Sequence, residues 1–231
     1  MTHFQIIYMI FFPKTTDFID IHSHSFEQEK GVFRIHNVFS TDFSKIPADL
    51  PLSIGLHPWH LTAQSTQELP EVLDQALTLQ NILAIGEAGL DRIIKSPLEE
   101  QLPVFRKQIE YSIDYRKPLI IHCVKAFSEI LALRKEYKSA TAWIVHGFNG
   151  SEELATECVE AGIYISLSQR LFRNPEKARK ITGIVPLSWV FAETDDDTMS
   201  IREVYGLTSQ FYGVSLSEVK RNIFENFSRI F

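Results

Sequence analysis

The sequence of 231 residues has few cysteines, little excess charge and no long apolar run, and each shortage excludes a class of protein. Two cysteines, Cys123 and Cys158, cannot build the disulfide framework of a small secreted domain. A formal charge of −6 argues against non-specific binding to duplex nucleic acid, which depends on many Lys and Arg contacts to phosphate. Hydrophobic residues make up 45% of the chain, which excludes a disordered tail. We expect a folded cytoplasmic protein with reduced thiols.

The most membrane-like stretch is the apolar segment 4–12 near the N-terminus. No Lys or Arg precedes it, no small-residue cleavage site follows it, and it has about half the length that a helix needs to cross a bilayer. We interpret residues 1–16 as an apolar lead-in, with Met9 as an alternative start, to a single domain that covers residues 1–231. We expect no membrane partner.

Short runs rich in Val and Ile recur along the chain, and most are separated by amphipathic segments of helix length. Runs such as PLIIHC and AWIVHG are apolar on successive residues, which is typical of strands buried on both faces of a parallel sheet. We predict strands at residues 17–21, 32–38, 51–55, 82–86, 118–122, 142–146, 162–167 and 189–193. Capping-box patterns predict helix starts at Ser65, Ser96 and Ser215, Asn174-Pro175 predicts another, and Gly162 is expected to end the helix that begins near Ser151.

Eight strands with helices after most of them predict an α/β fold, a (β/α)8 TIM-like barrel, with an open α/β sheet as the alternative. The connections between the first and second strands and between the second and third are too short for full crossover helices. We therefore expect the first quarter of the barrel to be irregular.

Polar residues recur where the apolar strands end. The C-terminal ends of all strands of such a barrel meet at one mouth, so these side chains are expected to converge there. In a strand, residues i and i+2 point to the same side, so His22 and His24 can reach one ion. A single histidine at a strand end is more often structural, but six such residues together predict a metal site. The candidate ligands are His22, His24, Glu87, His122, His146 and Asp195.

Four histidines and two carboxylates exceed the ligand number of one tetrahedral site. They suit two divalent ions bridged by a shared carboxylate, an arrangement used to hydrolyse phosphate esters and amides. Imidazole and carboxylate ligands together allow Mg, Mn or Zn. We therefore predict two divalent metal ions per chain.

The sequence resembles the TatD-related metal-dependent hydrolases, also called TatD-type deoxyribonucleases, within the amidohydrolase-like barrels. The resemblance runs from about residue 17 to the end of the chain. It is carried, in the family's order, by DIHSH (20–24), GLHPW (55–59), AIGEAGLD (84–91), KPLIIHC (117–123), VHGFNGS (145–151), YISLS (164–168), FAETD (191–195) and NFSRIF (226–231).

The resemblance implies specific roles for these residues. The first ion would be bound by His22, His24 and Asp195, the second by His122 and His146, and Glu87 would bridge the two. The catalytic residues would be Asp195, which orients or deprotonates the attacking water, and Glu87. His57 would lie near the substrate phosphate. The activity implied is metal-dependent hydrolysis of DNA, often 3′→5′ on single strands.

The loops that would hold a substrate depart from the family pattern. Lys125 follows Val124 where the family tends to have Arg two residues after the fifth-strand histidine, and Asp196-Asp197 stands where a Pro-containing loop is usual. As phosphate contacts we predict Lys125, Arg170 and Arg173. As contacts to a base we predict Trp59, Phe148 and the amide of Asn149.

Most of these predicted substrate contacts also have a purely structural explanation. Phe148 could pack inside a tight turn, Trp59 could be ordinary rim packing, and the basic run around Arg170 could be a solvated helix face.

We predict a divalent-metal-dependent phosphodiesterase, a deoxyribonuclease that acts on nucleic acid ends through a metal-activated water, with single-stranded DNA as its substrate. One alternative is a hydrolase of a small amide, ester or phosphoester, because attack by an activated water does not dictate the electrophile. Another is a non-catalytic metal-binding scaffold. The presence of Asp195 argues against the scaffold, since a structural metal site needs no such base.

Overall fold

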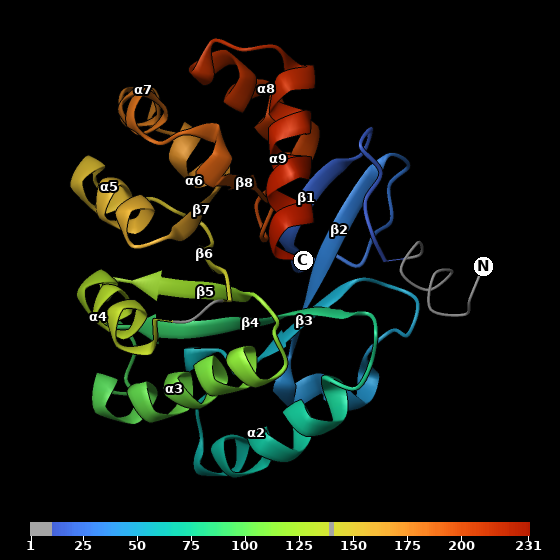
Figure 1. The fold of residues 1–231 in the computed structure, drawn as a ribbon. Coiled ribbons are helices and arrows are strands. Elements are labelled where there is room, and N and C mark those ends of the chain that lie inside the picture. Colours follow the sequence, from blue (N-terminus) through green and yellow to red (C-terminus); the bar gives the residue numbers. More distant parts are fainter. Residues whose placement is uncertain (1–10, 139–140) are drawn as a thin grey trace.

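The computed structural model describes residues 11–138 and 141–231, and at its centre lies a sheet of eight parallel strands (Figure 1). Each strand pairs with the next one in the sequence. The strands are β1 (Phe18–Ser23), β2 (Val32–Phe39), β3 (Leu52–Gly55), β4 (Ile82–Asp91), β5 (Leu119–Val124), β6 (Trp143–Val145), β7 (Ile163–Leu167) and β8 (Val190–Ala192). The predicted parallel order is confirmed.

The barrel closes through backbone contacts between the C-terminal ends of β1 and β8, which we call the seam. The N–H of Asp195 donates to the carbonyl of His22 at 2.9 Å, and the N–H of His24 donates to the carbonyl of Asp195 at 3.2 Å. Ser23 and Asp195 form a single parallel bridge. The seam distinguishes the barrel from the open-sheet alternative, and it lies at three of the predicted metal-binding residues.

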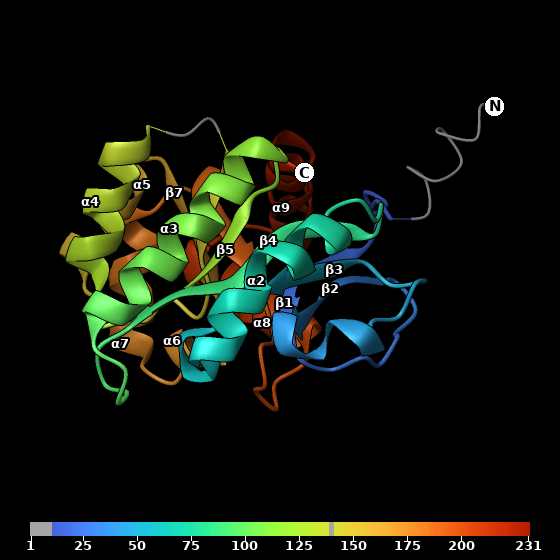
Figure 2. The same ribbon diagram turned by 90° about the horizontal axis from the view of Figure 1, so that it is seen from below.

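Helices surround the strands (Figures 1 and 2). α2, α3 and α4 cover the side of β3 to β5, whereas α8 and α9 cover β1 and β8. The helices are α2 (Ala63–Ala76), α3 (Leu98–Asp114), α4 (Phe127–Tyr137), α5 (Glu152–Glu160), α6 (Gln169–Phe172), α7 (Pro175–Ile184), α8 (Ile201–Tyr212) and α9 (Leu216–Ile230), with short 3-10 turns η1 (Ser40–Lys45), η2 (Pro58–His60) and η3 (Leu187–Trp189).

The first quarter of the barrel is irregular, as predicted. No helix separates β1 from β2 among the described residues, and only the 3-10 turn η1 lies between β2 and β3.

The helix starts test the predicted capping patterns. Ser215 and Asn174 cap α9 and α7 with their side chains, as predicted. The predicted cap of α2 is wrong by three residues and that of α3 by one. Thr62 caps α2 and forms a capping box with Ser65, so Ser65 is the partner and not the cap. Pro97 has an extended backbone and precedes α3, which has no side-chain cap.

Strand β4 runs to Asp91, five residues beyond its predicted end, because two glycines let its backbone approach β5 closely. A Cβ atom at Gly86 would lie 2.5 Å from the carbonyl oxygen of Ile120, and both Gly86 and Gly89 have positive φ. The register between β4 and β5 shifts across this segment. Glu87 therefore enters the barrel mouth from within a strand and not from a strand end.

The predicted lead-in lies mostly outside the described residues, which begin at residue 11, and so does Met9. Phe12, near the end of that segment, packs edge-to-face against Phe227 of α9 with a ring separation of 5.3 Å. In residues 11–138 and 141–231, no helix combines the length and the apolar character that crossing a membrane requires.

Candidate metal centre

Glu87 lies at the middle of the barrel mouth, and the predicted ligands surround it. Its Oε1 atom lies 2.8 Å from both His122 Nδ1 and His146 Nε2. Its Oε2 atom lies 3.4 Å from His22 Nε2 and 3.5 Å from His24 Nε2. The two oxygens thus face two different pairs of histidines, as a bridging carboxylate requires.

The seam half of the centre consists of His22, His24 and Asp195. Asp195 Oδ1 lies 3.6 Å from His22 Nε2 and 3.4 Å from His24 Nε2. Its other oxygen, Oδ2, accepts a hydrogen bond of 2.7 Å from Arg170. The carboxylate therefore offers one oxygen to the histidines while a guanidinium holds the other.

Charge compensation shifts the pKa values of the seam half. Burial raises the pKa of Asp195, but the neighbouring imidazoles of His22 and His24 outweigh it and hold the pKa below its usual value. Burial lowers the pKa of His24, yet hydrogen bonds to Asp195 and Glu87 prevail and raise it to about 9. The carboxylate is therefore ionised at neutral pH.

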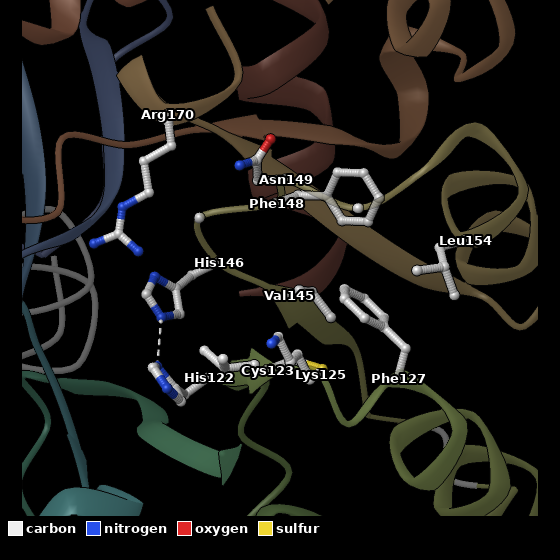
Figure 3. A pocket seen from close by; sticks show the side chains of 13 residues that line it. His122, Cys123, Lys125, Phe127, Val145, His146, Phe148, Asn149, Leu154 and Arg170 are labelled. Atoms are coloured by element: carbon white, nitrogen blue, oxygen red, sulfur yellow. Dashed lines mark hydrogen bonds between the residues drawn. The ribbon is translucent and has the colours of Figure 1, made fainter. Parts of the chain in front are cut away.

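The inner half of the centre consists of His122 and His146, on and just after the neighbouring strands β5 and β6. The Nε2 atom of His146 lies 3.4 Å from the Nδ1 atom of His122, as the dashed line in Figure 3 marks. Burial lowers the pKa of His146, but the charges of Glu87 and Glu193 outweigh it and raise the pKa well above its ordinary value. The carboxylates around His146 therefore favour a positive charge at this half, which a bound cation would also supply.

The spacing of the ligand atoms fits a divalent ion. Two atoms bound at about 2.1 Å to one tetrahedral ion lie about 3.4 Å apart, and the distances of 3.4–3.6 Å around His22 and His24 match that value. Both ring nitrogens of the buried His22 lack a hydrogen-bond partner among the described residues. Three groups have all their ligand atoms within 4.8 Å: His22, His24 and Glu87; His22, His146 and Asp195; and His57, Glu87 and His122.

His57, which the family resemblance places near the substrate phosphate, lies among the candidate ligands themselves. Its Nε2 atom is 3.1 Å from Glu87 Oε1, and its Nδ1 atom accepts a hydrogen bond from the N–H of Trp59. Burial lowers the pKa of His57. A role beside the substrate phosphate stays a prediction, and the geometry adds His57 to the possible ligands.

A pocket of about 380 Å³ adjoins the inner half of the centre (Figure 3). Lys125 and Arg170 contribute its cationic groups, whereas Phe127, Phe148 and Leu154 contribute apolar walls. In Figure 3, Arg170 and His146 lie toward one end of the pocket and the two phenylalanine rings toward the other. The pocket therefore combines charge near the histidines with an apolar interior.

The predicted contacts to a base differ in accessibility. Phe148 is only 1% exposed and packs edge-to-face against Phe127, whereas Trp59 is 64% exposed. Asn149 lines the pocket, but Lys177 donates to its side-chain oxygen at 2.8 Å. Of the three, Trp59 has the most free surface.

The predicted phosphate contacts differ in whether they line the pocket. Lys125 and Arg170 line the pocket. Arg173 does not line it and forms an ion pair of 3.4 Å with Asp197. Phosphate binding by any of the three stays a prediction.

Two buried carboxylates, Asp91 and Glu193, lie behind the inner half and were not predicted from the sequence. Asp91 Oδ2 is 3.3 Å from His122 Nε2, and Glu193 Oε1 is 3.5 Å from His146 Nδ1. A signal was present for Glu193, because it precedes Asp195 by two residues just as His22 precedes His24. Asp91 could be placed only once β4 was known to continue past Glu87.

A family model described as TatD related DNase matches residues 33–231. The uncharacterized metal-dependent hydrolase YabD of Bacillus subtilis is 28% identical over 186 residues, which cover 77% of this chain and 72% of that protein. A protein of Citrobacter koseri named 3′-5′ ssDNA/RNA exonuclease TatD is 28% identical over 146 residues, covering 61% of this chain and 55% of that one.

Two solved structures have the same fold. The crystal structure of YJJV, a TatD homolog from Escherichia coli K12, aligns with a TM-score of 0.80 and 22% identity and covers 94% of this chain and 99% of that one. The structure of a hydrolase of the TatD family from Entamoeba histolytica aligns with a TM-score of 0.74 and 17% identity, over 94% and 98% of the two chains.

Proposed function

The chain belongs to the TatD-related DNase family of metal-dependent hydrolases, and from that premise we propose that it is a phosphodiesterase that removes nucleotides from the ends of single-stranded DNA. The observation that carries the hydrolytic part is the convergence of the six predicted ligands around Glu87. The nucleic-acid part is supported by the name of the relative from Citrobacter koseri.

The donor set would hold two divalent ions, with Glu87 shared between them. When bound, a divalent ion lowers the pKa of a water molecule toward neutrality and offsets charge on the substrate oxygens. The residues that would hold the ions are His22, His24, Glu87, His122, His146 and Asp195.

Asp195 is the base in this proposal. Its pKa lies below its usual value, so the carboxylate is ionised at neutral pH, as a group that is to accept a proton must be. Its Oδ1 atom faces the histidines, and Arg170 prevents the carboxylate from rotating by holding Oδ2. Asp195 takes a proton from the attacking water and returns it to the leaving oxygen as the phosphorus–oxygen bond breaks.

Binding of a negatively charged strand needs local cations, because the whole chain carries a formal charge of −6. Lys125 and Arg170 line the pocket beside the inner half and would contact phosphate. The exposed ring of Trp59 would stack on a base, and the buried Phe148 would shape the pocket wall.

The test uses a 5′-labelled single-stranded oligonucleotide with Mg²⁺ or Mn²⁺. We expect products shortened from the 3′ end, no cleavage with a chelator, and loss of cleavage in Asp195→Asn. Asp196→Asn is the matched control, because Asp196 is the next residue along the chain, its side chain is 71% exposed, and its ion pair in the described residues is a contact of 3.5 Å to Arg170 and not to a histidine; cleavage should persist. An oligonucleotide left intact with every divalent ion would contradict the nucleic-acid assignment.

A second candidate is hydrolysis of a small phosphoester, ester or amide, and the pocket favours it. A volume of about 380 Å³ with apolar walls is in the range of small-ligand sites. Metal-dependent turnover of a small chromogenic ester by a protein that leaves oligonucleotides intact would select this candidate.

A further inference from the structure

Each histidine of the inner half lies between two carboxylates. His122 faces Glu87 with Nδ1, and its Nε2 lies 3.3 Å from Asp91 Oδ2. His146 faces Glu87 with Nε2, and its Nδ1 lies 3.5 Å from Glu193 Oε1. Asp91 and Glu193 are both 0% exposed. The second ring nitrogen of both imidazoles therefore points at a buried negative charge.

Neutral groups hold these two carboxylates in place. Asp91 accepts hydrogen bonds from the indole N–H of Trp59 at 2.7 Å and from the N–H of Ile93 at 2.9 Å. The side-chain amide of Gln101 bonds to both the N–H and the carbonyl of Asp91 at 2.8 Å, which fixes the backbone. Glu193 accepts from the N–H of Gly147. Because its donors are neutral, Asp91 keeps its charge, whereas the charge of Glu193 also acts on the guanidinium of Arg170.

The seam half lacks such support. In the described part of the chain, the carboxylates within ion-pair distance of His22 and His24 are Glu87 and Asp195, both on the Nε2 side. The Nδ1 atom of His22 has neither a hydrogen-bond partner nor a carboxylate within ion-pair distance there, whereas His146 Nδ1, which also lacks a hydrogen bond, faces Glu193 at 3.5 Å. In addition, Arg170 places a positive charge 2.7 Å from Asp195 Oδ2. The charge that the seam half offers to a cation is therefore partly compensated.

We propose that Asp91 and Glu193 are positioning residues that make the inner half the higher-affinity metal site, an inference that rests on the proposed two-ion centre. A carboxylate that accepts the outer N–H of a metal-binding imidazole fixes its tautomer and orientation and raises the basicity of the other nitrogen. At limiting metal the inner half therefore fills first, and the seam half fills only at higher concentration.

Trp59 should report metal binding by the inner half through its fluorescence. Its indole N–H donates to the same oxygen of Asp91 that faces His122, so a change at His122 alters the environment of the indole. The ring is mostly exposed, and His57 and His122 lie beside it at ring separations of 5.0 and 6.0 Å. We expect the fluorescence of Trp59 to change during the tight binding phase. In Trp59→Phe that fluorescence change should be absent.

The experiment is a titration of the chelator-stripped full chain with Zn²⁺, followed by calorimetry and by tryptophan fluorescence. We expect two phases, with the fluorescence change in the tighter one. Asp91→Asn and Glu193→Gln each weaken the tight phase by about 10–100-fold and leave the weak phase in place. Asp20→Asn is the matched control, since Asp20 is equally buried but bonds to Arg34 and Thr194; its tight phase is unchanged.

A second measurement does not depend on any variant. In crystals of the wild-type protein grown with one equivalent of Zn²⁺, we expect anomalous density beside His122 and His146. Density between His22 and His24, two indistinguishable phases, or a tight phase that survives both substitutions would overturn the proposal. Two bound ions without cleavage of any substrate would refute only the proposed function, whereas a protein that binds no ion would refute both.

Discussion

The two halves of the metal centre share Glu87 but are held in place in different ways. His22, His24 and Asp195 come from the first and last strands, and the backbone hydrogen bonds of the seam bring them together. His122 and His146 lie on and just after neighbouring strands in the middle of the sheet, and a buried carboxylate lies behind each ring. One site is therefore organised both by strand pairing and by side chains that lie behind the ligands.

The largest effect is expected from Glu87→Gln, because Glu87 is common to both halves. Loss of its charge should weaken both binding phases by more than the roughly 100-fold that loss of an outer carboxylate costs, and turnover should fall to background. Calorimetric titration and oligonucleotide cleavage measure the two effects. Loss of one ion only, with the other bound as in the wild type, would contradict the shared position.

Asp195→Asn should reduce turnover much more than it weakens metal binding by the inner half. We expect turnover to fall by about 10²–10⁴-fold, since the base is lost, while the tight phase at His122 and His146 weakens less than in Asp91→Asn, because Asp195 lies on the seam side, although its oxygen comes within 4.8 Å of the His146 ring nitrogen. The same titration, paired with a cleavage assay, checks both. If the tight phase disappeared, the two halves would not be independent.

Metal binding should release protons. In the metal-free protein the pKa of His24 is about 9, because Asp195 and Glu87 outweigh burial. Below that pH His24 is protonated, and it must lose the proton to bind a cation, so affinity falls as the pH falls. At neutral pH we expect His24→Ala to release about one proton fewer than the wild type. Calorimetry in buffers of different ionisation enthalpy counts the protons, and equal heats in all buffers would contradict the raised pKa.

The smallest effect concerns Arg170, which contacts the seam half and also lines the pocket beside the inner half. Loss of one phosphate contact changes the slope of log affinity against log salt by about 0.7 for a single strand. We expect Arg170→Ala to flatten the slope by that amount and Arg173→Ala, which pairs with Asp197 outside the pocket, to leave it unchanged. Oligonucleotide titrations in Ca²⁺ measure both slopes. Equal slopes in both variants would remove Arg170 from the binding surface.

The sequence predicted those features that depend on local pattern. Consecutive apolar residues predicted the buried parallel strands, and histidines or carboxylates at their ends stood out because such residues are rare in apolar runs. Asn174 and Ser215 could be assigned as helix caps because a cap depends on the few residues that follow it.

Features set by distance across the fold could not be predicted. The role of Asp91 depends on how the glycines of β4 shift its register against β5, which no local pattern reveals. The pairing of Arg170 with Asp195 joins helix α6, which follows β7, to the loop after β8. Phe148 has the sequence context of an exposed mouth residue, yet its ring packs against Phe127, because space around a side chain is a property of the whole fold.

The seam also has a consequence for how the protein is made. Ser23 and Asp195, which form its bridge, are 172 residues apart in the chain. At the usual rates of synthesis, the ribosome needs on the order of ten to thirty seconds to travel between them. Throughout that interval the nascent chain carries His22 and His24 without Asp195, and the inner pair is complete once His146 is translated, still before Asp195. A cation captured during translation therefore meets the inner pair in a barrel that is still open, and the base arrives only with the last strand.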